Sequence, residues 1–360
     1  MKRLLMTADT VGGVWTYALE LARALRIHNV EVLLATMGQP VSPAQQAEVD
    51  AVENVRVFES AFRLEWMHEP WEDVAAAGRW LLDLRDRHQP DLIHLNGYTH
   101  ASLPWNLPVL VVGHSCVFSW WKAVHGEWAP SPWQRYRDEV TLGLSSAAHV
   151  AAPTQAMLRS LHEIYGGFEK ATVIPNGCNS SRFGPSSKIP LILSAGRMWD
   201  EAKNASALAS VASVVKWPIS LAGQTGFVPA RRRHAVHYLG HLSSGDLANW
   251  MSRASIFASP ARYEPFGLSI LEAAMSGCAL VLGDIASLRE LWDEAALFVK
   301  PDDHAQLERT LNELIRDRDR LHQLQVLAQE RSQRFTAERM AEKYTELYSA
   351  LCNSSSSITR

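Results

Sequence analysis

Cysteine is scarce in this chain, and its positions define no paired site. The 360 residues include 4 cysteines, which stand at Cys116, Cys178, Cys278 and Cys352. No two of them form a Cys-x-x-Cys pair, and no histidine accompanies them at the spacing of zinc ligands. The pattern therefore argues against a disulfide framework or a zinc site and favours free thiols in a reducing compartment.

Long apolar runs and an excess of charge of one sign are missing too. No stretch of about 18 apolar residues occurs, so we expect no transmembrane helix. The apolar run within the first residues, MKRLLMTADTVGG, is too short for a signal peptide, which makes the cytoplasm the expected location. The net charge of −3 gives no overall electrostatic reason to expect nucleic acid as a partner. Peripheral contact with a membrane is left open.

What the chain does contain is the composition of an ordinary globular protein, 47% apolar and 20% charged, over a length that favours two domains. The segment Phe183–Pro190, FGPSSKIP, is rich in Gly, Pro and Ser and is the candidate linker. We therefore predict a first domain over residues 1–184 and a second over 185–335.

Short apolar strands alternate with helical segments in both halves, which predicts an α/β fold with parallel sheets and right-handed crossovers. Before the linker, strands are expected at 3–7, 31–36, 55–58, 91–95, 109–113, 149–152 and 171–174. After the linker, they are expected at 191–195, 219–222, 236–239, 256–258, 279–283 and 296–298. A last helix is expected from 337 to 351.

The most informative segment is residues 261–281, ARYEPFGLSILEAAMSGCALV. Pro265 disfavours α geometry at Glu264, so this carboxylate is expected in a loop, with a short helix following over residues 269–276. Glu272 stands on that helix. Both carboxylates can accept hydrogen bonds from hydroxyl groups.

The start of this helix is expected to bind an anion. It offers the backbone N–H groups of Gly267, Leu268 and Ser269 and the positive end of the helix dipole. An anion site between two carboxylates suits a ligand that carries phosphate between hydroxyl-rich rings. A nucleotide-sugar has this chemistry.

Other candidate residues also follow predicted strands. Arg197 and Lys203, in SAGRMWDEAKN, can bind phosphate through a planar fork and a point charge respectively. Gly12 and Gly13 let the backbone approach a ligand, although the glycine fingerprint of dinucleotide-binding proteins is absent. His114 lies at a strand tip.

The segment SPARYEPFGLSILEAAMSGCALV resembles the donor-site signature of the retaining glycosyltransferases of the GT-B fold, family 4, also called glycosyl transferases group 1. The resemblance implies two Rossmann-like doubly wound domains that face each other across a cleft. The first would be on the acceptor side and the second would bind the donor, with a helix at about 336–353 packing back onto the first domain.

The implied activity is transfer of a sugar from a nucleoside-diphosphate sugar to an acceptor hydroxyl with retention of configuration, in glycan, glycolipid or glycoconjugate biosynthesis. The acceptor would be a small molecule, a glycan or a lipid-linked molecule. No metal or other cofactor is expected. The leaving phosphate oxygen would take the proton of the acceptor, so no protein base is required.

The resemblance also implies roles for single residues. The catalytic set would be His114, Arg197, Lys203 and Glu264, and the donor-binding set would be Gly12, Gly13, Arg197, Lys203, Glu264, Phe266, Gly267, Leu268, Ser269 and Glu272. Arg197 and Lys203 would bind the diphosphate, Glu264 the sugar hydroxyls, and Glu272 the ribose hydroxyls. Lys203 stands one residue farther from Arg197 than in most members of the family. HLNGYTHA places Asn96 and His100 near the strand edge of His114.

Alternatives are a GT-B-fold nucleotide-sugar epimerase or hydrolase, a phosphorylase, a non-catalytic nucleotide- or carbohydrate-binding protein, and a dehydrogenase. A phosphorylase would need a cofactor-binding lysine that we do not identify. A separate hypothesis concerns Trp120, Trp121, Trp128 and Trp133, which are expected to flank a Gly/Pro/His-rich loop and to contribute to an acceptor site.

Overall fold

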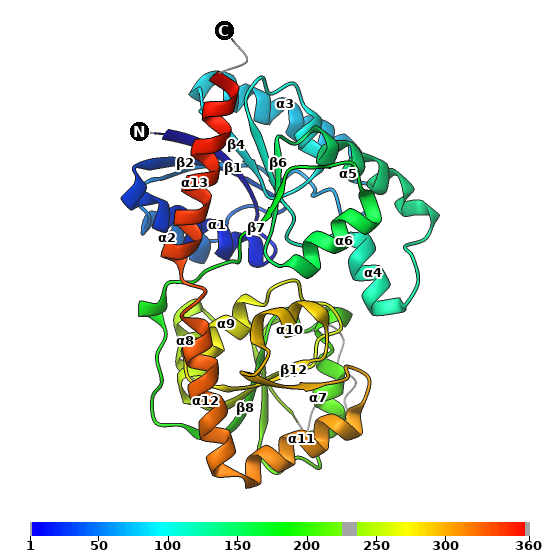
Figure 1. The fold of residues 1–360 in the computed structure, drawn as a ribbon, viewed down its shortest axis with the longest axis vertical. Coiled ribbons are helices and arrows are strands. Elements are labelled where there is room, and N and C mark those ends of the chain that lie inside the picture. The colour runs from blue at the N-terminus through cyan, green and yellow to red at the C-terminus, as the bar shows by residue number, and fades with distance from the viewer. Residues whose placement is uncertain (1, 225–235, 357–360) are drawn as a thin grey trace. The chain divides into compact units, whose positions relative to one another are not determined.

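The computed structural model describes residues 2–224 and 236–356, which divide into two compact units (Figure 1). The first unit comprises the chain up to Lys122, the segment Glu127–Gly177 and the segment from Ala337; the second comprises Ala123–Gly126 and Cys178–Thr336.

The boundary at Gly177 precedes the one predicted at residue 184 because Cys178 already packs into the second unit. Its side chain is fully buried there, and its N–H donates to the carbonyl of Phe335 at 3.2 Å.

The first unit is built on a seven-stranded sheet of order β3-β2-β1-β4-β5-β6-β7, in which every pairing is parallel. Its strands are β1 (Lys2–Asp9), β2 (Val30–Met37), β3 (Val55–Glu59), β4 (Leu92–Leu95), β5 (Val109–Val112), β6 (His149–Ala152) and β7 (Ala171–Val173). Its main helices are α1 (Gly13–Leu25), α2 (Pro43–Asp50), α3 (Trp71–His88), α4 (Val117–His125), α5 (Gln134–Ser146), α6 (Gln155–Tyr165) and α13 (Ala337–Ser356). The chain order reverses between β1 and β4.

Burial explains why these segments form strands and helices. The central strands present apolar side chains on both faces, as expected for a parallel sheet covered by helices. Leu81 of α3, Val140 of α5 and Leu161 of α6 are fully buried in one core cluster with β4, β5 and β6. Helix α13 packs against α1, where the rings of Tyr344 and Tyr17 lie 6.2 Å apart between centroids.

The second unit contains a six-stranded sheet of order β10-β9-β8-β11-β12-β13, again with parallel pairings only. Its strands are β8 (Ile189–Ala195), β9 (Ile219–Ala222), β10 (Val236–Gly240), β11 (Ala254–Ser259), β12 (Ala279–Gly283) and β13 (Ala296–Val299). Its helices are α7 (Ala205–Val211), α8 (Ser244–Arg253), α9 (Leu268–Met275), α10 (Ala286–Trp292), α11 (His304–Arg316) and α12 (Arg318–Ser332). The chain order reverses between β8 and β11, and one core cluster lies on each face of the sheet.

The predicted alternation of strands and helices is confirmed, and each expected strand forms with ends shifted by about two residues or fewer. Trp120 and Trp121 stand on helix α4, which the sequence did not predict, and the Gly- and Pro-containing loop that they were expected to flank begins at Gly126. Helix α2 was not predicted either, although Ser42 and Gln45 form a capping box before it. Within the described residues, no helix combines the length and the apolar character needed to span a membrane.

Candidate functional site

The candidate donor site lies in the second unit, where the chain order reverses between β8 and β11. In open parallel sheets, ligands bind beyond the carboxyl ends of the strands at such a reversal. Here β8 ends at Ala195 and β11 ends at Ser259, so the loops that carry Arg197 and Glu264 both begin at this edge. The next strand, β9, ends just before Gly223, where an added Cβ would lie 1.8 Å from the carbonyl oxygen of Gly196. Glycine is required at 223 so that the two loops can approach each other.

Lys203 and Glu264 meet at this edge as a hydrogen-bonded ion pair between Nζ and Oε2. Their side chains are 20% and 11% exposed, so the pair is mostly buried but open on one side. Glu264 lies in the loop before α9, as Pro265 predicts, and its carbonyl oxygen accepts a 2.6 Å hydrogen bond from the Ser287 hydroxyl. The carboxylate is therefore held at a fixed place in the loop.

Asp200 organises the loop after β8. Its Oδ1 accepts from the N–H of Ala202 at 3.0 Å and so caps a 3-10 turn, Glu201–Lys203, while its Oδ2 accepts from Arg197 Nη2 at 3.1 Å. The guanidinium of Arg197 also lies 5.6 Å from the ring centroid of Trp199, which is 47% exposed. Lys203 ends this turn and reaches Glu264.

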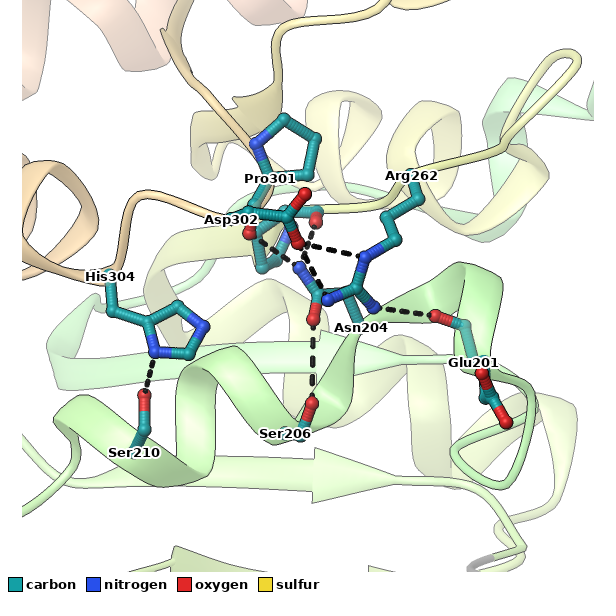
Figure 2. A network of polar contacts seen from close by, with 9 residues as sticks. Glu201, Asn204, Ser206, Ser210, Arg262, Pro301, Asp302 and His304 are labelled. Carbon is teal, nitrogen blue, oxygen red and sulfur yellow. Dashed lines mark hydrogen bonds and ion pairs between the residues drawn. The ribbon is translucent and has the colours of Figure 1, made fainter. Parts of the chain in front are cut away.

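A network of polar contacts joins the loops that follow β8, β11 and β13 (Figure 2). Asn204, which adopts a left-handed conformation with φ of 54°, donates to the carbonyls of Pro260 at 2.9 Å and Pro301 at 2.7 Å. Arg262 donates to Asp302 Oδ1 and to the carbonyl of Glu201. The loops carrying Lys203 and Glu264 are thus fixed by their neighbours.

The start of α9 borders the same site. Gly267 precedes the helix with φ of 86°, and an added Cβ would lie 2.7 Å from Ile270 Cδ1, so glycine is required there. The Ser269 hydroxyl donates to the carbonyl of Ala195 at 3.2 Å and ties the helix to the end of β8.

The side chains at the start of α9 pack within the protein. Phe266 is 3% exposed, and its ring meets Phe335 edge-to-face with the centroids 5.8 Å apart. Leu268 packs against the same core cluster. The side chains of Phe266, Leu268 and Ser269 are thus engaged within the protein, so a donor contact from these residues, as predicted, would use their backbone N–H groups. Glu272 lies half-buried on α9.

The remaining predicted residues belong to the first unit. Gly12 donates its N–H to Asp9 Oδ1 at 2.8 Å, and Gly13 begins α1. His114 follows β5, and its Nε2 lies 2.9 Å from Asn96 Oδ1. Burial lowers the pKa of His114 to about 3, so the ring is neutral at physiological pH. His100, in the 3-10 turn that follows β4, lies with its Nε2 at 3.0 Å from the carbonyl oxygen of Val74.

Three residues that shape the loops of the candidate site were not predicted from the sequence. Asp9 shapes the Gly12 turn, Asp200 holds Arg197, and Asn204 joins three loops. Only Asp200 carried a local signal, because it directly precedes a short helical turn as a capping residue does. In the described parts of the chain, no group of three or more His, Cys, Asp or Glu side chains is placed to hold a metal ion.

Two parallel, doubly wound units of this kind define the GT-B class of glycosyltransferases. Sucrose-phosphate synthase from Thermosynechococcus elongatus superposes with a TM-score of 0.83 at 19% identity, covering 98% of this chain and 100% of the other. HepE from Anabaena, solved in complex with UDP-glucose, gives 0.76 at 19% identity with the same coverage. At these identities the likeness establishes the fold.

The sequence comparisons identify the family. A family model described as glycosyltransferase family 4 matches residues 11–182, and one described as glycosyl transferases group 1 matches residues 189–317. Glycogen synthase of Mycobacterium tuberculosis is 25% identical over 320 residues, which cover 78% of this chain and 76% of that protein. The chain belongs to glycosyltransferase family 4 and is a glycosyltransferase of the GT-B fold.

Proposed function

We propose that the chain transfers a hexosyl-type sugar from a nucleoside-diphosphate sugar to an acceptor hydroxyl with retention of configuration. One observation carries the proposal: Lys203 and Glu264 meet at the order reversal of the second sheet, in a loop system that also carries Arg197. Two cations match the charge of a diphosphate, and a carboxylate accepts hydrogen bonds from sugar hydroxyls.

The exposure of the two cations supports this role. The Arg197 side chain is 41% exposed and that of Lys203 is 20% exposed, so a ligand can reach both. Each is already paired with a carboxylate, Asp200 or Glu264, and is therefore fixed before a ligand arrives. Preorganised charges of this kind stabilise the departing diphosphate, and losing one of them costs on the order of 100-fold in rate.

Two similar proteins support a nucleotide-sugar donor. The Anabaena protein HepE was solved with UDP-glucose, and the Mycobacterium tuberculosis relative is a glycogen synthase.

The proposed reaction needs no nucleophile from the protein. The bond between the anomeric carbon and the phosphate oxygen breaks, and the acceptor oxygen bonds to the same face of that carbon. The leaving phosphate oxygen takes the acceptor's proton. Arg197, Lys203 and the N–H groups at the start of α9 bind the diphosphate, while Glu264 and Glu272 hold sugar and ribose hydroxyls. We propose that no metal takes part.

Isothermal titration calorimetry with UDP, GDP and ADP tests the site. Arg197→Ala should weaken binding of the matching nucleotide at least tenfold, which is about 1.4 kcal/mol. The control Arg320→Ala, at an exposed position on α12, should bind as the wild type does. Unchanged affinity in Arg197→Ala would remove the site assignment.

NMR of the product tests the reaction. An α-linked donor and a suitable acceptor should give an α-linked product. A β-linked product would contradict retention. Donor isomerised or hydrolysed without any acceptor would favour the epimerase or hydrolase alternative instead.

A further inference from the structure

A continuous line of hydrogen bonds runs through the first unit from His114 to the last helix. His114 Nε2 lies 2.9 Å from Asn96 Oδ1, and the same oxygen lies 3.2 Å from His94 Nε2. On the far side of that ring, His94 Nδ1 lies 2.7 Å from the hydroxyl of Tyr348 on α13. His94 is fully buried, whereas His114 is half-buried.

The orientation of the Asn96 amide is fixed by Thr7. Asn96 Nδ2 donates to the carbonyl oxygen of Thr7 at 2.7 Å, and its backbone N–H donates to the Thr7 hydroxyl at 2.9 Å. A carbonyl can only accept, so the amide NH₂ must face Thr7 and Oδ1 must face the histidines. Because Oδ1 carries no hydrogen, His114 must hold its proton on Nε2.

The same reasoning fixes His94. Its Nε2 also faces Asn96 Oδ1 and must carry the proton, which leaves Nδ1 as the acceptor for the Tyr348 hydroxyl. The hydroxyl of Tyr17 lies 3.4 Å from His94 Nε2 and can share this N–H. Every proton in the line from Tyr348 to His114 therefore has one assigned place.

None of the tyrosines that face the two rings supplies a negative charge that would favour an imidazolium. Tyr17 on α1 and Tyr344 and Tyr348 on α13 surround the pair, and burial raises the pKa of each tyrosine, so none of them is an anion near neutral pH. Burial also lowers the pKa of His94 and of His114 to about 3.

We propose that Asn96 is a positioning residue that holds His114 as its Nε2–H tautomer and leaves Nδ1 free to accept a hydrogen bond from a hydroxyl of the acceptor substrate. The inference rests on the proposed function, because it gives His114 a hydroxyl-bearing ligand. His114 then orients a hydroxyl and neither donates nor removes a proton.

The tautomer can be observed without any assay of activity. Two-bond ¹H–¹⁵N correlation spectra of wild-type protein labelled with ¹⁵N-histidine separate the Nε2–H form, the Nδ1–H form and the imidazolium. The His114 signal, assigned by its loss in His114→Gln, should report the Nε2–H form between pH 5 and 8. An Nδ1–H form, or protonation within this range, would overturn the proposal.

A pH profile then tests the positioning role. Asn96→Asp keeps an accepting oxygen toward the histidines, replaces the NH₂ that donates to the Thr7 carbonyl with a second oxygen, and adds a negative charge beside both rings, which favours the imidazolium and converts Nδ1 from an acceptor to a donor. The ratio of the variant's kcat/KM for transfer to that of the wild type should fall about tenfold toward pH 5 and recover toward pH 8. A variant with a lower melting temperature but a wild-type pH profile would mean that Asn96 is only structural.

The conservative variant Tyr348→Phe provides a matched comparison. It removes the donor to His94 Nδ1 and should shift the His94 signals while His114 keeps the Nε2–H form, because Asn96 alone fixes that proton. Loss of the His114 tautomer in this variant would contradict the assignment to Asn96. The spectra need no substrate. They therefore test the tautomer of His114 even if the proposed transfer reaction is wrong, and the two failures can be told apart.

Discussion

The ion pair between Lys203 and Glu264 makes the sharpest test of the donor site, because its two members should affect different parts of the ligand. Replacing Glu264 by Gln keeps the shape of the side chain but frees Lys203 from its partner. Lys203 should then be more available to a diphosphate, whereas the sugar hydroxyls should lose a charged acceptor. The two effects have opposite signs and can be measured separately.

The sizes follow from the exposure of the pair. Two unit charges 4 Å apart attract by about 4 kcal/mol at an effective dielectric constant of 20 and by about 1 kcal/mol in water. With side chains 20% and 11% exposed, this pair should lie between those limits, at about 2 kcal/mol. A phosphate that binds Lys203 competes with only part of its attraction to Glu264, because the rest persists in the complex. The Glu264→Gln variant should therefore bind the free nucleoside diphosphate equally well or up to about tenfold more tightly than the wild type.

Binding of the sugar-bearing nucleotide should respond in the opposite direction. A hydrogen bond to a charged group contributes about 1.5–3 kcal/mol, so the preference for the nucleotide-sugar over the nucleoside diphosphate should fall by roughly 10- to 100-fold. Calorimetry with both ligands measures this ratio, and Glu330→Gln on the exposed surface of α12 serves as the control. Equal weakening of both ligands in Glu264→Gln would refute the division of roles.

Four further outcomes are expected. Asp200→Asn should leave nucleoside-diphosphate binding unchanged or up to about tenfold tighter, since Arg197 loses a competing carboxylate as Lys203 does in Glu264→Gln; calorimetry on an Arg197→Ala background should show no such change. Gly267→Ala should lower the free energy of unfolding by about 1–3 kcal/mol in denaturant titration, because φ of 86° and the close Ile270 leave no room for a Cβ. The free energy of unfolding should fall as the pH drops below 6.5, because His94 and His114 take up protons in the unfolded chain but not in the folded chain, where their pKa values are about 3. Each histidine contributes at most about 1.4 kcal/mol per pH unit. In denaturant titrations at a series of pH values, replacing His94 by Gln should flatten the dependence of this free energy on pH. Transfer should continue at the wild-type rate after treatment with EDTA and dialysis, and activity restored only by added divalent metal would contradict the proposed metal-free reaction.

The sequence predicted the fold well because its signals are local. Buried parallel strands appear as apolar runs, and Pro265 and Gly267 mark the loop and the start of α9. These rules place Glu264 and the helix start at one strand edge without knowledge of the tertiary structure.

What the sequence did not predict depends on contacts between distant segments. Asn204 acts through carbonyls that are 56 and 97 residues away along the chain, and no local pattern marks such partners. The same holds for Phe266, which reads as part of a binding motif but packs against Phe335. The tautomer of His114 depends on the orientation of the Asn96 amide, which Thr7 determines from another strand.

Helix α13 has a consequence for the order in which the protein assembles during synthesis. The first unit is completed by the last segment of the chain, from Ala337, and the main segment of the second unit, Cys178–Thr336, is encoded before it. During synthesis, Thr336 is therefore made before Tyr344 and Tyr348, the residues of α13 that contact Tyr17 and His94 in the folded protein. The first unit therefore cannot complete its fold until α13 has been made, and Tyr17 and His94 lack their contacts with α13 until then. The second unit needs no segment after Thr336 to fold.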